Sequence, residues 1–187
     1  MLNPAARRIS AAAILLSALA LSGCSAPATT SATSSGPDLR FGRVHEDKGR
    51  LSMALLEAKE KRSRGQRVWC VPFARDLSGI NIYGNAKEWW RRASGIYGRG
   101  HQPAPGAVMA FSATRRNPNG HVAVVNRVVS MREVLVDHAN WPRPSQISLK
   151  MRAVDVSEKN DWSAVRLEST KGALGSIYPV TGFIYKK

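Results

Sequence analysis

The pattern of the sequence changes at Gly106, from apolar residues at helical spacing to short runs of β-branched residues. Upstream of this point, three helices are predicted: 49–62, 70–78 and 86–93. Downstream, turn formers separate six predicted strands: 108–112, 122–129, 134–139, 147–156, 164–167 and 178–184. Helices followed by a run of strands predict an α+β domain, in which the helices pack on an antiparallel β-sheet.

The first two helices carry local start and stop signals. Asp47 is the expected cap of the first helix, and Gly65 is expected to end it. Its apolar residues recur at i, i+3, i+4 and i+7 and should share one face: Leu51, Ala54, Leu55 and Ala58. The second helix has Pro72 in its first turn, where a missing N–H costs nothing, and Gly79 at its end.

Residues 1–23 are typical of a secretory signal, because Arg7 and Arg8 precede an apolar run too short to span a bilayer comfortably. The run ends in Leu-Ser-Gly-Cys24, which resembles the lipobox of bacterial lipoproteins. That resemblance implies a lipid anchor on Cys24; the alternative is a plain cleaved signal with a chance cysteine. Residues 24–45 predict a disordered tether rich in Ser, Thr, Ala and Pro, and the folded domain is expected over 46–187.

The charge of the chain is strongly positive, with 28 Lys and Arg against 13 Asp and Glu. Such a field favours nucleic acid, an acidic membrane surface or a polyanionic wall polymer, although a cationic surface can also serve solubility alone. Export argues against nucleic acid and for a polymer of the envelope. The predicted location is the cell envelope, with the chain anchored to the membrane through Cys24. In a host with two membranes, Ser25 is compatible with the periplasmic side of the outer membrane.

Cys70 has no partner for an internal disulfide if Cys24 is acylated. A lone free cysteine in an exported protein is either a buried small hydrophobe or a reactive thiol. Its expected position at a helix start, with Arg67 and Arg75 near in sequence, favours a thiolate.

Histidines supply the candidate base and its partner. His121 is expected at the start of a buried strand, after the turn 117–120. On the next strand His138 and Asn140 should share one face, while Asp137 points to the other. A side chain beside His121 could fix its tautomer, as in a catalytic triad. The Cys and His spacings match no usual zinc pattern, so no metal or other cofactor is expected.

Five sequence blocks then occur in an order that resembles one known family. They are Val68-Trp-Cys-Val-Pro-Phe-Ala-Arg75, Gly84-Asn-Ala86 with Trp89-Trp90, Pro103-Ala-Pro-Gly-Ala-Val108, Gly120-His-Val-Ala-Val-Val125 and His138-Ala-Asn-Trp141. Together they resemble the CHAP domain, the cysteine- and histidine-dependent amidohydrolase/peptidase family of the NlpC/P60-like, papain-like superfamily. The resemblance covers roughly residues 48–187.

This resemblance implies a papain-like α+β fold and hydrolysis of peptidoglycan, by an N-acetylmuramoyl-L-alanine amidase or an endopeptidase. Residue by residue, the nucleophile falls on Cys70 and the base on His121. The family commonly has an acid, any residue, then Asn in the last block, whereas this chain has His138 in place of the acid. The third member therefore stays open between His138, Asn140 and, through a local bulge, Asp137, in that order of preference.

Three further residues are expected at the substrate. Trp69 and Trp141 flank motif residues and are the aromatics favoured for the groove, whereas the other tryptophans are expected in the core. Gln66 is a candidate second donor to the oxyanion, beside the backbone N–H of Cys70.

Two other functions compete with hydrolysis. The fold could serve as a catalytically inactive, basic, wall-binding scaffold lipoprotein, and the missing acid leaves room for this. An effector aimed at neighbouring cells is a further alternative, against which the lipid anchor argues. The sequence leaves open which wall bond is cut and whether a protein activator takes part.

Overall fold

The computed structural model describes residues 47–170 and 172–187. The predicted signal peptide, Cys24 and the predicted tether lie outside the described residues. None of the described helices is long and apolar enough to cross a membrane.

Two helices open the described part, at the predicted places. Helix α1 spans Lys48–Ser63, and the Asp47 side chain caps it by accepting a hydrogen bond from the backbone N–H of Arg50 at 3.0 Å. The predicted apolar face is confirmed: Ala54 and Ala58 are buried, and Leu51 and Leu55 pack against the same cluster. Helix α2 spans Cys70–Ser78 and ends at Gly79, whose positive φ of 69° suits glycine.

The third predicted helix is shorter and tighter than expected. A 3₁₀ turn, η1, spans Ala86–Glu88, and α3 covers only Trp89–Arg92. Trp89 is fully buried there and packs with the residues of α2. Burial of this one large side chain therefore anchors a segment that is too short to be stable as an isolated helix.

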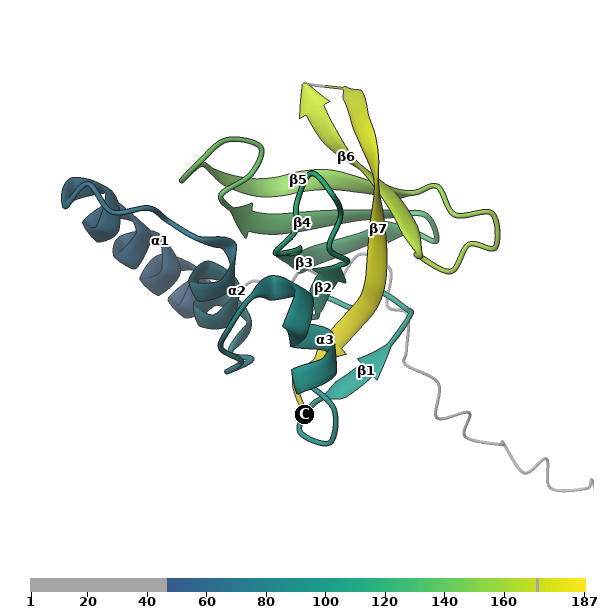
Figure 1. Ribbon diagram of the computed structural model, residues 1–187, viewed down its shortest axis with the longest axis horizontal. Coiled ribbons are helices and arrows are strands. Elements are labelled where there is room, and N and C mark those ends of the chain that lie inside the picture. Colours follow the sequence, from purple (N-terminus) through teal and green to yellow (C-terminus); the bar gives the residue numbers. More distant parts are fainter. Residues whose placement is uncertain (1–46, 171) are drawn as a thin grey trace, which may run out of the picture. The chain divides into compact units, whose positions relative to one another are not determined.

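The strands form one antiparallel sheet, as predicted. Seven strands lie in the described part of the chain: β1 Gly98–Gly100, β2 Val108–Phe111, β3 His121–Ser130, β4 Glu133–Ala139, β5 Ile147–Asp155, β6 Ala164–Thr170 and β7 Ala173–Tyr185. They pair in the order β1-β7-β2-β3-β4-β5-β6. Because β7 pairs with β6 as well as with β2, strands β2 to β7 close on themselves into a barrel, which β7 crosses in Figure 1.

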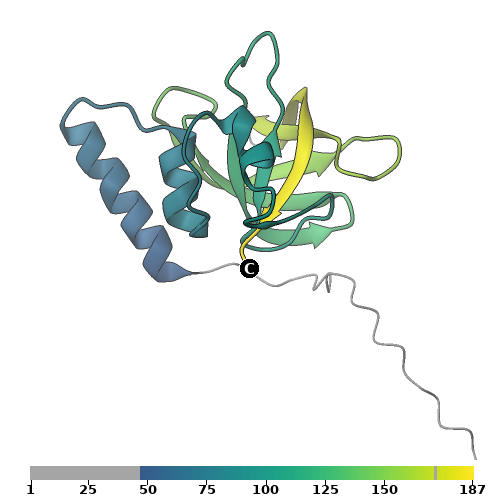
Figure 2. The same cartoon turned by 60° about the horizontal axis from the view of Figure 1, so that its bottom comes forward.

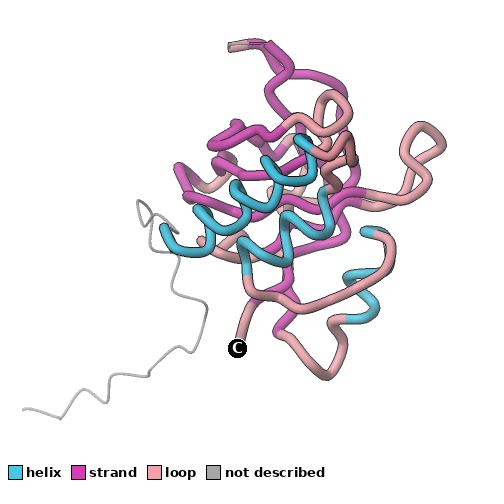
Figure 3. Tube along the Cα trace, turned by 90° about the vertical axis from the view of Figure 1, so that its left-hand side faces the viewer, coloured by secondary structure: helices cyan, strands magenta, loops and turns pink. Residues whose placement is uncertain are grey.

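The core has two parts, separated by the wall of the barrel. Val122 and Val124 of β3 face the helices, whereas Ala123 and Val125 face the barrel interior. Helix α2 packs between α1 and strands β3 and β4, so both helices cover the same side of the barrel (Figure 2). Figure 3 shows α1 and α2 lying beside each other across these strands. Burial on both faces explains why 122–125 is continuously apolar in sequence.

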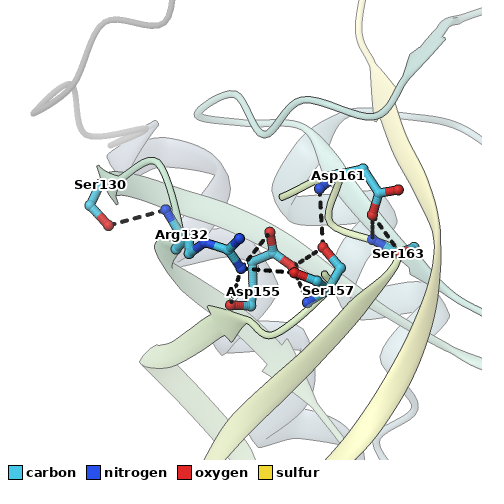
Figure 4. A network of polar contacts seen from close by, with 6 residues as sticks. All are labelled: Ser130, Arg132, Asp155, Ser157, Asp161 and Ser163. Atoms are coloured by element: carbon cyan, nitrogen blue, oxygen red, sulfur yellow. Dashed lines mark hydrogen bonds and ion pairs between the residues drawn. The ribbon is translucent and has the colours of Figure 1, made fainter. Parts of the chain in front are cut away.

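A polar network fixes the turn after β5 (Figure 4). Asp155 is buried, and its carboxylate accepts hydrogen bonds from the backbone N–H and the hydroxyl of Ser157, at 2.8 and 2.6 Å. Arg132 lies 3.8 Å from the same carboxylate and donates to the Ser157 carbonyl at 2.9 Å. The charge of Asp155 is thus compensated within the domain.

Candidate active site

A cleft of about 710 Å³ contains the predicted nucleophile and base. Cys70 lies there at the first residue of α2, and His121 at the first residue of β3. The remainder of the lining comes from the segments around residues 67–72, 84–86, 116–120 and 140–142. A larger depression, of about 960 Å³, lies along α1 and α2 and is lined by neither Cys70 nor His121. The smaller cleft is therefore the candidate site.

The predicted aromatic residues also line this cleft. Trp69 is 48% exposed and precedes the nucleophile, and Trp141 contacts the His121 ring with 5.0 Å between ring centroids. By contrast, Trp89 and Trp162 are buried in the core. Trp69 and Trp141 thus lie at the cleft, Trp89 and Trp162 lie in the core, and Trp90 is only partly buried.

The turn before β3 places His121. Gly120 has a φ of +69°, and a Cβ built on it would lie 2.9 Å from both the backbone N of Lys87 and the carbonyl O of Phe111. The Asn117 side chain donates to the Gly120 carbonyl at 2.9 Å, and the Lys87 N–H donates to the Asn119 carbonyl at 2.8 Å. Only a glycine fits this close approach, which ties the start of β3 to the η1 segment.

His121 has a second histidine as its hydrogen-bond partner. Its Nε2 lies 2.9 Å from Nδ1 of His138, which is fully buried on β4. The Nε2 of His138 in turn lies 3.1 Å from the sulfur of Met151 on β5. A line of three side chains thus runs from the cleft into the wall of the barrel.

The chemistry of Met151 determines the tautomers along this line. A thioether sulfur carries no proton and can only accept, so Nε2 of His138 is the donor. The Nδ1 of a neutral His138 then carries a lone pair and accepts from Nε2–H of His121. The remaining nitrogen of His121, Nδ1, is left as a lone pair able to accept a proton. Nothing in the sequence indicated a role for Met151, because a methionine on a strand ordinarily packs against other apolar side chains.

The other two candidates for the third position have different partners. Asp137 points to the other face of β4, as expected, where its carboxylate accepts from the Asn126 side chain at 2.8 Å and from the backbone N–H of Lys150 at 2.6 Å. Strand β4 ends at Ala139, so Asn140 does not continue the strand face of His138, contrary to expectation. With a φ of 63° it lines the cleft, and its Oδ1 accepts from Nε of Arg67 at 2.9 Å.

Gln66 does not reach this site. It is exposed at the end of α1, where its backbone N–H donates to the Lys61 carbonyl at 2.8 Å, and it is not among the described residues that line the cleft. The role suggested for it as an oxyanion donor has no support in this arrangement. Two arginines that the sequence did not single out as binding residues, Arg67 and Arg116, do line the cleft.

Burial keeps both reacting groups neutral. Desolvation raises the pKa of the Cys70 thiol, and hydrogen bonds from the backbone N–H groups of Val122, Val71 and Cys70 itself only partly offset this. Desolvation also lowers the pKa of His121 to about 3 and that of His138 well below its ordinary value. The expected thiolate is therefore not the resting form: the helix start is present, but burial outweighs it.

The described part of the chain holds no group of three or more His, Cys, Asp or Glu side chains that could bind a metal ion. The cleft itself offers a thiol and a neutral imidazole whose Nδ1 can accept a proton.

Comparison with known proteins gives one family. Residues 62–140 match the model of the CHAP domain family. The matched range includes Cys70, His121, His138 and Asn140, whereas Met151 and strands β5 to β7 follow it. No curated protein matches the chain. Residues 62–140 are thus similar to the CHAP domain, and the described fold, in which helices pack on an antiparallel sheet, agrees with this match.

Proposed function

We propose that the chain is a peptidoglycan hydrolase that cleaves amide bonds with Cys70 as nucleophile and His121 as base. The observation that carries this proposal is the shared cleft of the two residues, together with the hydrogen bond that leaves Nδ1 of His121 as a proton acceptor. The CHAP match supports wall amides as the substrate class. Both a muramoyl–alanine amidase and an endopeptidase fit this description.

The reaction begins from the neutral pair. Nδ1 of His121 takes the thiol proton as the sulfur of Cys70 attacks the carbonyl carbon of a wall amide. The carbonyl π electrons move to oxygen, and the backbone N–H groups at the start of α2 stabilise the resulting oxyanion. Since proton transfer accompanies attack, the enzyme needs no preformed thiolate.

The second half of the reaction reverses these roles. The imidazolium of His121 gives its proton to the departing amine as the C–N bond breaks and a thioester remains on Cys70. Water then attacks the thioester, with His121 again as base, and releases the acid and the free thiol. His138 acts through His121, because its Nδ1 accepts from Nε2–H and stabilises the positive ring. We therefore propose His138 as the third member, a positioning residue, ahead of Asn140 and Asp137.

The same proposal includes a lipid anchor and a location in the cell envelope. Cys24 carries the lipid, residues 24–45 act as a spacer, and the domain reaches the wall from the membrane surface. Residues 24–187 carry 26 Lys and Arg against 13 Asp and Glu, and this positive excess favours contact with anionic polymers of the envelope.

The test is digestion of purified peptidoglycan by the full chain in detergent, beside Cys70→Ala, with mass spectrometry of the released fragments. Fragments that require the thiol are expected, and their masses name the bond. The Trp69-lined, basic cleft would also suit a wall-binding scaffold. Wall binding that is equal in both proteins, with no fragments from either, would favour that second function.

A further inference from the structure

One arginine at the mouth of the cleft is held in place without an acidic partner. The guanidinium of Arg67 lies 4.1 Å from the ring centroid of Trp69, and its Nε donates to Oδ1 of Asn140 at 2.9 Å. Oδ1 of Asn140 also accepts from the backbone N–H of Ser145 at 3.1 Å, which fixes the amide. Within the described residues, the two terminal nitrogens of this guanidinium have no hydrogen-bond partner.

Other arginines of the domain are engaged differently. Six of them pair with an Asp or Glu: Arg50, Arg64, Arg75, Arg92, Arg132 and Arg152. The described residues that line the cleft include Arg67 and Arg116 but no Asp or Glu. The cleft around Cys70 therefore carries two positive charges that no lining residue balances.

We propose that Arg67 is a binding residue for a carboxylate of the substrate, next to the amide that Cys70 attacks. The two free terminal nitrogens can each direct one N–H, in the same plane, at the two oxygens of a carboxylate, and the fixed Nε removes much of the entropy cost of orienting the side chain. Trp69 covers one face of the guanidinium and limits its contact with water. Asn140 is then the residue that orients Arg67.

The substrate class follows, and this step rests on the proposed hydrolase function. Among wall components, the stem peptide carries free carboxylates beside its amide bonds, on D-glutamate and at its C-terminus. Arg67 accordingly selects stem peptides with a free carboxylate over their amidated forms. Arg116 lines the same cleft and adds attraction of the same sign.

The test measures binding to the full-length Cys70→Ala protein, so that hydrolysis does not interfere. The probes are L-Ala-γ-D-Glu-L-Lys-D-Ala with both carboxylates amidated, and the two forms that each keep one carboxylate. We expect one of the latter to bind about tenfold tighter than the fully amidated peptide, as a charge-assisted pair of hydrogen bonds allows. Arg67→Met in the same background should bring this ratio close to one.

Arg99→Met is the matched control. Its guanidinium lies 5.0 Å from the Trp90 ring centroid and donates to Trp90 O and Ser94 Oγ, yet Arg99 does not line the cleft. This variant removes the same charge and should keep the tenfold ratio. Asn140→Asp should lower the ratio, because the new carboxylate would occupy Arg67.

Three results would overturn the carboxylate site: equal affinity for all three peptides, a ratio that survives Arg67→Met, or no peptide binding at all. Wall digestion by the unmodified chain is read separately. Digestion without carboxylate selection would refute the role of Arg67 alone. Selection without digestion would refute the hydrolase and leave Arg67 as a binding residue of a scaffold.

Discussion

Substitution of His138 by leucine separates the function of its Nδ1 from the space that its ring fills. Leucine is apolar and of comparable bulk, so the interior of the barrel stays filled while the acceptor for Nε2–H of His121 disappears. His138→Gln keeps an acceptor oxygen in the side chain and serves as the conservative comparison. Asp137→Asn, on the other face of β4, is the matched control.

The size of the effect follows from burial. An unpaired buried donor costs about 1–3 kcal/mol, and the loss bears more heavily on the positively charged ring formed during the reaction. We therefore expect His138→Leu to lower kcat by about 10- to 100-fold, with little change in KM, and to lower the free energy of unfolding by about 1–3 kcal/mol. His138→Gln should recover part of kcat, and Asp137→Asn should change kcat less than about twofold.

Rates of fragment release from purified peptidoglycan give kcat and KM, and denaturant unfolding gives stability. Nitrogen-15 NMR of labelled histidine reads the tautomer directly: His121 should carry its proton on Nε2 in the unmodified chain and lose this preference in His138→Leu. The reasoning is refuted if His138→Leu retains kcat within about twofold, or if Asp137→Asn is the slower variant.

Three further predictions concern the neutral pair and the turn before β3. Because burial raises the pKa of the Cys70 thiol, its rate of alkylation should keep rising with pH up to the ordinary pKa of 9.0 and beyond, and a plateau of reactivity at pH 6 would contradict this. His121 and His138 have folded-state pKa values below their unfolded value of 6.5, so the unfolded chain binds more protons below that pH. As the pH is lowered from 6.5 to about 3, the free energy of unfolding should then fall by up to about 1.4 kcal/mol per pH unit for each histidine. A free energy of unfolding that stays constant over this pH range in denaturant titrations would contradict the burial of neutral histidines. Gly120→Ala should lower kcat and lower the free energy of unfolding by about 2 kcal/mol or more. Gly65 has the same φ of +69° but open space around it, so Gly65→Ala should lower the free energy of unfolding by only about 1–2 kcal/mol. Equal losses in thermal unfolding would show that the close contact at Gly120 does not matter.

Local signals in the sequence were sufficient for the first two helices, but not for the third, which is a 3₁₀ turn followed by one short helical turn. Asp47, Pro72 and Gly79 act within one turn of their own positions, so the bounds of α1 and α2 follow from neighbouring residues alone. The six predicted strands exist for a similar reason, since β-branched runs between turn formers are themselves local.

The pairing of strands that are far apart in the sequence could not be predicted from such local signals. Strand β7 begins at Ala173, earlier than predicted, because 173–177 includes Gly175 and Ser176, which have little strand preference of their own. Pairing with β6 holds that half of β7 and closes the barrel. The short strand β1 was missed because two of its three residues are glycine, and only its pairing with β7 defines it.

In the candidate site, too, some features could be predicted from local sequence and others depended on the tertiary structure. The match of sequence blocks pointed to Cys70 and His121, and both line one cleft. The expectation of a resting thiolate on Cys70 does not agree with the structure. Desolvation, which depends on tertiary burial, raises the pKa of this thiol more than the backbone N–H groups at the start of the helix lower it. Asn140 turns out of the strand face of His138 because β4 ends one residue earlier, at a left-handed backbone position that the sequence did not indicate.

The most direct measurement of the central claim counts new amino groups in purified peptidoglycan after incubation with the full chain, Cys70→Ala and His121→Gln. Hydrolysis of an amide releases one amine for each bond, whereas cleavage of the glycan releases reducing ends instead. The account predicts new amines with the unmodified chain and none above background with either variant. Equal numbers of new amines with the unmodified chain and with Cys70→Ala would contradict it.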